Sequence, residues 1–227
     1  MFVYSDGGEI KINISKSYLL MVLNEEKGIC YSRGFEILGF AGALLMDLYL
    51  QGKITTIKGI VEIADSSSTG DEILDQILEI IKNSEKNRSL MSWIDRISQK
   101  YDFYYLFFDL MERQGILKSD IAPELKTKLY SLQKPKIKSE LLDKIHNVVD
   151  SDEEPSINTI CLLVLLEESK LIKVYFPRDF RKKLRNRIKV LFRSELLDSS
   201  KREMILGIRK DIVKVIGARN MFLTDEA

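Results

Sequence analysis

One segment of the 227-residue chain is apolar on every side, and it restricts the folds that the chain can adopt. Residues 35–50 read FEILGFAGALLMDLYL, and Gly52 follows where a helix commonly ends. A helix that is apolar all round lies either at the centre of a protein or in a membrane. This one is too short for a bilayer and carries Glu36 and Asp47, so it predicts a central helix. Its small residues, at positions 39 and 41–43, would let neighbouring helices approach closely.

Helical periodicity recurs along most of the remaining chain. Thr69 with Glu72, and Ser200 with Glu203, have the spacing of capping boxes at the starts of two helices. Pro177 opens a basic helix. The segments predicted to be helical are 17–24, 69–81, 89–99, 102–114, 138–149, 156–168, 177–193 and 200–217. The chain is therefore expected to be one helical domain, residues 1–227.

Two segments are extended in character. Residues 53–65, KITTIKGIVEIAD, alternate β-branched and polar residues around Gly59, which is typical of one strand or of a small hairpin. Residues 128–137, KLYSLQKPKI, contain Pro135, which is unfavourable in a central strand. A projecting hairpin or an edge strand is expected from Lys128 to Ile137.

The residues that carry catalysis or bind metals are few. His146 is the only histidine, and the chain has no P-loop, GxSxG, GxGxxG or zinc-ligand spacing. The acidic loop of residues 150–154 lacks the spaced ligands and the glycine of a calcium loop, so a solvated loop is the favoured interpretation. We expect no catalytic site, no metal site and no cofactor.

Three features indicate the compartment. The first residues, MFVYSDGGEI, do not have the pattern of a signal peptide, and no apolar run reaches the roughly 18 residues that cross a bilayer. Cys30 and Cys161 lie far apart in apolar surroundings, which favours buried thiols in a reducing compartment over a disulfide. A cytoplasmic location is expected.

The basic helix has the most informative pattern of charge. In PRDFRKKLRNRIKVLFR, residues 177–193, an apolar stripe is surrounded by eight cations and a single acid, Asp179. The stripe consists of Phe180, Leu184, Ile188 and Leu191, and the cations are Arg178, Arg181, Lys182, Lys183, Arg185, Arg187, Lys189 and Arg193. Such a helix either offers a cationic face to phosphates, on a membrane or on nucleic acid, or is a solvated face neutralised by acidic neighbours. A net charge of +1 makes non-specific nucleic-acid binding the less favoured of these.

Six collinear segments resemble the Golgi phosphoprotein 3 family over nearly the whole chain. LGFAGALLMDLYLQGKI (38–54) is similar to its first core helix, DSSSTGDEILDQILEIIKN (65–83) to a strand-to-helix junction, and SLMSWIDRIS (89–98) to its tryptophan helix. MERQGIL (111–117) resembles a helix end, KLYSLQKPKI takes the place of the β-hairpin, and ICLLVLLEESKLIKVYF (160–176) resembles a late core helix.

The resemblance implies a mainly α fold, with a central helical bundle ringed by amphipathic helices and a protruding β-hairpin used for self-association. It also implies a peripheral membrane protein, which in eukaryotic members binds phosphatidylinositol 4-phosphate and acts as a trafficking adaptor. The lipid-ligand positions of those members differ here. The core-helix arginine falls on Ala41, the paired arginines fall within residues 101–106, where none is basic, and the loop tryptophan falls near Ser32.

We therefore expect a non-catalytic, peripherally membrane-associated protein that binds anionic lipid headgroups. Tyr31 either sits at headgroup level or closes its loop over the core, with Arg33 beside it for phosphate. The other expected lipid-binding residues are in the basic helix: Arg178, Arg181, Lys182 and Arg185. The alternative is a nucleic-acid-binding or regulatory domain that uses residues 178–193. A homo-oligomer through the hairpin near residues 128–137 is the other expected association.

Overall fold

The computed structural model describes residues 2–5, 8–31, 35–124, 127–151 and 153–224. These residues form ten helices and four two-stranded antiparallel hairpins, so the prediction of a mainly α fold is confirmed. The helices are α1 (Ile14–Val22), α2 (Glu36–Leu50), α3 (Glu72–Lys82), α4 (Leu90–Ser98), α5 (Tyr101–Arg113), α6 (Pro135–Asp150), α7 (Ile157–Glu168), α8 (Ile172–Tyr175), α9 (Arg178–Leu191) and α10 (Ser199–Thr224). The hairpins pair β1 (Phe2–Ser5) with β2 (Gly8–Lys11), β3 (Leu23–Asn24) with β4 (Ile29–Cys30), β5 (Ile54–Ile57) with β6 (Ile60–Ile63), and β7 (Leu117–Ala122) with β8 (Thr127–Leu132).

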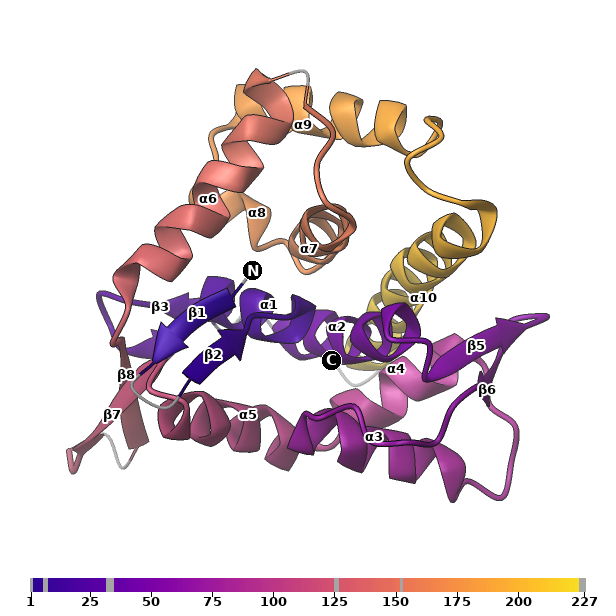
Figure 1. Ribbon diagram of the computed structural model, residues 1–227, viewed down its shortest axis with the longest axis horizontal. Coiled ribbons are helices and arrows are strands. Elements are labelled where there is room, and N and C mark those ends of the chain that lie inside the picture. Colours follow the sequence, from indigo (N-terminus) through magenta and orange to yellow (C-terminus); the bar gives the residue numbers. More distant parts are fainter. Residues whose placement is uncertain (1, 6–7, 32–34, 125–126, 152, 225–227) are drawn as a thin grey trace.

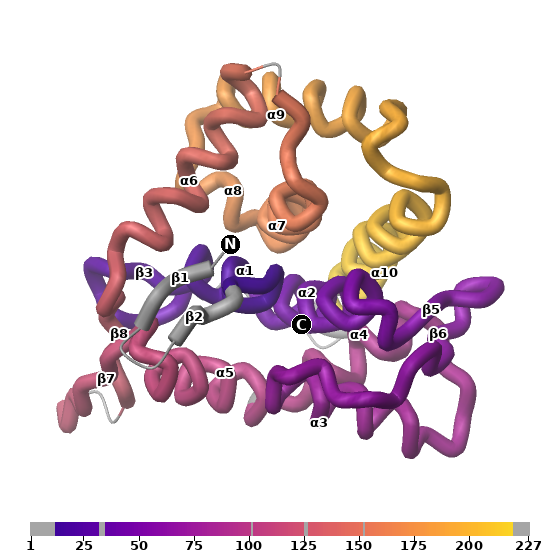
Figure 2. The backbone as a smooth tube through the Cα atoms, in the orientation of Figure 1, coloured from indigo at the N-terminus to yellow at the C-terminus, as the bar shows by residue number. Residues whose placement is uncertain are grey.

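Helix α2 lies at the centre of the molecule, as its apolar sequence predicts (Figures 1 and 2). Residues 37–48 are all buried, and α1, α4, α7 and α10 pack against the helix. A Cβ added to Gly39 would lie 2.1 Å from Tyr18 Oη of α1, and one added to Gly42 would lie 3.0 Å from side chains of α7 and α10. The missing side chains therefore allow three helices to approach α2 closely, because the distance between packed helices depends on the residues at the contact.

The other helices lie on two sides of this centre. In Figure 1, α3, α4 and α5 lie below α2, while α6, α7, α8 and α9 lie above it. Helices α3 and α4 bury one apolar face each, as expected of amphipathic helices. Helix α7 is buried on nearly every side and joins α1 and α2 in the centre.

Helix α1 begins earlier than its sequence indicates, at Ile14 instead of residue 17, and it ends at Val22. The carboxylate of Asp47, on α2, accepts hydrogen bonds from the backbone amides of Ile14 and Ser15, both at 2.9 Å. Asn13 caps the same turn by accepting from Lys16 N at 3.0 Å. The first turn of α1 is thus stabilised partly by a residue of another helix, which local periodicity does not reveal.

Both predicted capping boxes are wrong. At α3 the cap is Asp71, two residues after Thr69, and its carboxylate accepts from two amides of the first turn. At α10 the carboxylate of Asp198, two residues before Ser200, accepts from the backbone amide of Lys201. Aspartate caps as well as serine or threonine does, and its charge is favourable at a helix start. Helix α10 also continues through Gly217, where its end was expected.

The extended segment at 53–65 is a hairpin and not a single strand. Strands β5 and β6 pair in register from Ile54 with Ile63 to Ile57 with Ile60. The two residues between them, Lys58 and Gly59, both have positive φ angles, of 51° and 77°. This is the backbone that a two-residue type I′ turn requires.

The second hairpin begins earlier in the chain than the sequence predicts. Strand β7 starts at Leu117, which pairs with Leu132, and Lys128 pairs with Ile121 near the turn. Pro135 does not belong to the hairpin, because it begins α6, where the missing amide proton costs no hydrogen bond. Ile137 consequently lies in the first turn of a helix.

Candidate functional site

The basic helix forms where the sequence predicts it. Helix α9 follows Pro177, and the side chains of Leu184, Ile188 and Leu191 are buried. Helices α6 and α8 pack against it. The apolar stripe is therefore used to hold α9 on the rest of the protein, which leaves the opposite side of the helix to solvent.

Five cations line the solvent side of α9 and its C-terminal end. They follow one another at intervals of four, three, four and four residues, which places them along one side of a helix. This basic stripe consists of Arg178, Lys182, Arg185, Lys189 and Arg193. All five are exposed, and at 1.5 Å per residue the stripe is about 22 Å long.

Only one member of the basic stripe is paired with a carboxylate in the described part of the chain. Arg185 Nε lies 2.6 Å from Glu167 Oε1 of α7. Arg178, Lys182, Lys189 and Arg193 have no acidic partner among the described residues. The interpretation of a face neutralised by acidic neighbours therefore applies to Arg185 alone.

The remaining predicted cation of this helix, Arg181, is not part of the basic stripe. Its side chain is half-buried on the flank of α9, and its Nε is buried without a hydrogen-bond partner among the described atoms. The stripe instead includes Lys189 and Arg193, which were not among the predicted site residues. Their spacing from Lys182 and Arg185 is the sequence signal that identifies them.

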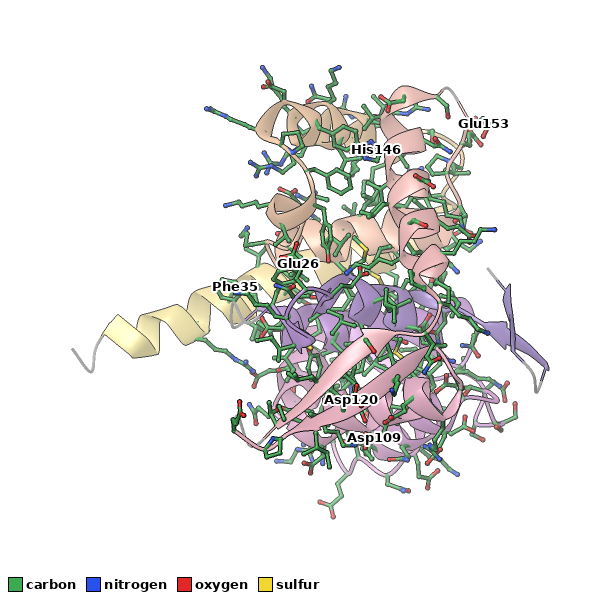
Figure 3. The ribbon with its side chains drawn as sticks, turned by 90° about the vertical axis from the view of Figure 1, so that its left-hand side faces the viewer. Glu26, Phe35, Asp109, Asp120, His146 and Glu153 are labelled. Carbon is green, nitrogen blue, oxygen red and sulfur yellow. The ribbon has the colours of Figure 1, made fainter. Side chains whose placement is uncertain are left out.

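Tyr31 lies half-buried after β4 and contacts the core. Its backbone amide donates to Val22 O at 2.9 Å, and its ring meets that of Tyr175 edge-on, with centroids 6.2 Å apart. Tyr175 is the last residue of α8, three residues before the first residue of α9, so Tyr31 packs against the segment that precedes the basic helix. Arg33 lies outside the described residues. In Figure 3, nitrogen-tipped side chains project from α9 toward the side on which Phe35 lies.

A buried lysine that the sequence did not single out supports this region. Lys138 Nζ donates to Leu23 O at 2.7 Å, pairs with Glu25 at 2.9 Å and lies 5.4 Å from the ring centroid of Tyr175. Burial lowers the pKa of Lys138, while Glu25 opposes that change. The lysine thus joins α6 to β3 and to α8, and its role is structural.

Two of the positions to which the resemblance assigns the family's lipid ligands carry no positive charge here, and the third, Ser32, lies outside the described residues. Ala41 is fully buried in α2. Tyr104, within residues 101–106, packs edge-on against Phe40, with centroids 5.6 Å apart. Burial holds the pKa of the Tyr104 phenol well above its usual range. Neither position offers a charge to a phosphate.

The side chains most often used in catalysis, those of the histidine and the two cysteines, pack against aromatic rings or are at least partly buried. His146 is half-exposed, and its ring lies 4.8 Å from that of Phe180 and 5.3 Å from that of Phe176, measured between centroids. Both cysteines are free thiols, as the favoured interpretation predicts, and burial raises the pKa of Cys30 to about 11 and that of Cys161 further. Within the described ranges, no group of three His, Cys, Asp or Glu side chains is placed to hold a metal ion.

The family model described as Golgi phosphoprotein 3 (GPP34) matches residues 14–207 of this chain. No curated protein matches it. Among the helices of the described residues, none combines the length and the apolar character needed to cross a membrane.

Proposed function

The chain belongs to the Golgi phosphoprotein 3 family, and from this premise we propose that it is a non-catalytic, adaptor-like peripheral membrane protein. In this proposal the basic stripe of α9 binds anionic phospholipid headgroups. The observation that carries it is the placement of five exposed cations along one side of a helix whose other side is buried in the protein. A cytoplasmic location belongs to the same proposal.

Electrostatics explains why a stripe, and not one pocket, is sufficient. A lysine or arginine close to an anionic leaflet contributes about 1 kcal/mol of attraction. The four unpaired cations of the stripe then supply about 4 kcal/mol together, provided that they reach the surface at the same time. Their placement on one side of α9 supports this sum, because cations on one side of a helix face one surface together.

Selectivity for phosphatidylinositol 4-phosphate is proposed to be weak. The corresponding positions of the family pocket hold Ala41 and the aromatic residues of α5, so they lack the cations that would grip one headgroup. We propose that this lipid binds as one anion among several, in proportion to its charge.

Self-association through the β7–β8 hairpin is the second part of the proposal. Ile121 lies near the turn of this hairpin and is 77% exposed. Among the large apolar side chains that the structure describes, it has the largest exposed fraction. Figure 3 shows the hairpin toward the viewer, with Asp120 of β7 labelled on it. The strand edges of a projecting hairpin present unpaired backbone groups to a second copy, and Ile121 adds apolar surface beside them.

Vesicle flotation tests the lipid-binding proposal. The full chain is expected to float with phosphatidylcholine vesicles that contain phosphatidylserine, or phosphatidylinositol 4-phosphate at equal total charge, and not with phosphatidylcholine alone. A gel-shift assay with double-stranded DNA at the same ionic strength covers the alternative function. Binding to DNA without flotation would replace the lipid proposal by the nucleic-acid alternative, and binding to neither would refute both.

A further inference from the structure

A cavity of about 310 Å³ lies between α7, α9 and α10, on the flank of the basic stripe. Figure 1 shows α7 nearly end-on, below α9 and to the left of α10. Its apolar lining comes from all three: Val164 of α7, Ile188 of α9 and Leu206 of α10, together with Phe192. Val164 and Ile188 are buried, whereas Leu206 remains 39% exposed. The cavity therefore has an apolar floor that is open to solvent at Leu206.

The charged residues that line the cavity form two groups: two ion pairs in its walls, and two cations at its rim without an acidic partner among the described residues. Glu167 pairs with Arg185 at 2.6 Å, and Glu168, which is buried, pairs with Arg209 at 2.7 Å. These two pairs neutralise the carboxylates of the cavity and tie α9 and α10 to α7. The other cations are Lys189 and Arg193, which line the same cavity without an acidic partner among the described residues.

From this arrangement we infer that the cavity binds a single-chain anionic amphiphile, with its hydrocarbon chain on the apolar floor and its phosphate or carboxylate at Lys189 and Arg193. Small-molecule sites are typically apolar cavities of roughly 300 Å³ or more with a few placed polar groups, and this cavity has both features. An inorganic anion would gain nothing from the apolar floor. A neutral chain would leave both rim cations unpaired.

The inference rests on the proposed function, because Arg185, Lys189 and Arg193 belong both to the basic stripe and to the cavity. It adds an apolar component to what would otherwise be a purely electrostatic contact. Each buried methylene strengthens binding about fourfold, so a chain of a few carbons changes the affinity by orders of magnitude.

Calorimetric titration of the full chain with dodecyl phosphate, below its micelle concentration, tests the inference. We expect one molecule bound per chain, and inorganic phosphate bound about a hundredfold more weakly. Leu206→Trp narrows the opening of the cavity and is expected to lower the affinity for dodecyl phosphate about tenfold or more. Leu206→Asp places a carboxylate beside the bound anion and is also expected to lower this affinity. Val213→Trp is the matched control, because Val213 is also an exposed apolar residue of α10 but does not line the cavity.

Three results would overturn the inference: equal affinities for dodecyl phosphate and inorganic phosphate, unchanged affinity in both Leu206 variants, or an equal loss in the Val213 control. Flotation separates this failure from failure of the proposed function. Flotation of the wild type without dodecyl phosphate binding rejects the cavity alone, whereas dodecyl phosphate binding without flotation rejects the membrane proposal alone. Reduced flotation of Leu206→Trp assigns the bound chain to a bilayer lipid, and unchanged flotation with lost dodecyl phosphate binding assigns it to a free amphiphile.

Discussion

Removing two lysines from the basic stripe tests the membrane proposal most directly. In the double variant Lys182→Ala, Lys189→Ala, both replaced side chains are exposed and neither has an acidic partner in the described part of the chain. Alanine favours helix, so α9 is expected to fold unchanged. Replacing Arg185 instead would leave the Glu167 carboxylate without its partner.

The expected loss follows from the charges removed. At about 1 kcal/mol for each cation near an anionic surface, the two substitutions cost about 2 kcal/mol, which is about a thirtyfold weaker partition onto the vesicles. Raising the salt to roughly 1 M shortens the Debye length to about 3 Å and should release the wild type as well.

The matched control is Lys183→Ala, Lys86→Ala, which removes the same charge from exposed lysines outside the stripe. Lys183 lies on another side of α9, and Lys86 lies in the connection between α3 and α4. Figure 1 shows α3 and α4 on the side of α2 opposite to α9. Flotation with vesicles of increasing phosphatidylserine content measures both variants. Equal loss in the two double variants, or wild-type flotation of Lys182→Ala, Lys189→Ala, would refute the assignment of the membrane contact to this stripe.

Four further predictions concern the fold and its surfaces. Gly39→Ala should lower the free energy of unfolding in urea by about 2 kcal/mol or more despite alanine's helix propensity, because the added Cβ meets Tyr18. Burial raises the pKa of Asp47 from 3.8 to about 6, so its ionisation should lower the free energy of unfolding by about 2 kcal/mol as pH rises from 4 to 7, and urea titrations of Asp47→Asn at several pH values should lack this decrease. Cys161 should react with iodoacetamide only after unfolding, as mass spectrometry of native and denatured protein would show, since the thiol is buried and its pKa is raised. Ile121→Asp should shift any self-associated form toward monomer in sedimentation velocity without changing the unfolding midpoint.

The sequence predicted those parts of the fold that depend on neighbours in the chain. The central helix was predictable because residues 35–50 are apolar at every phase of the helical period, and the position of α9 followed from Pro177 and the apolar stripe. Strand β7 was not predicted, because apolar and polar residues alternate only weakly in its sequence LKSDIA. The predicted extended segment instead included Pro135, which begins α6. The first turn of α1 was not predicted, because the carboxylate that accepts hydrogen bonds from the amides of Ile14 and Ser15 belongs to Asp47, more than 30 residues away.

In the candidate site, too, the features that depend on one segment were predictable, and those that depend on the packing of several segments were not. The basic stripe depends on spacing within one helix, so Arg178, Lys182 and Arg185 were predictable. The cavity depends on how α7, α9 and α10 meet, and no periodicity in one segment predicts that Glu167 would pair with Arg185. The contact of Tyr31 also depends on packing between distant segments, since its partner Tyr175 is 144 residues further along the chain.

The close contact between α1 and α2 limits how the sequence of such a protein can change. Tyr18 fills the space that a side chain at position 39 would occupy, and its phenol donates a hydrogen bond to Glu36 O at 3.0 Å. A larger residue at position 39 is therefore compatible with this packing only if position 18 becomes smaller. Related chains should vary at these two positions together, and a glycine at 39 should accompany a tyrosine at 18.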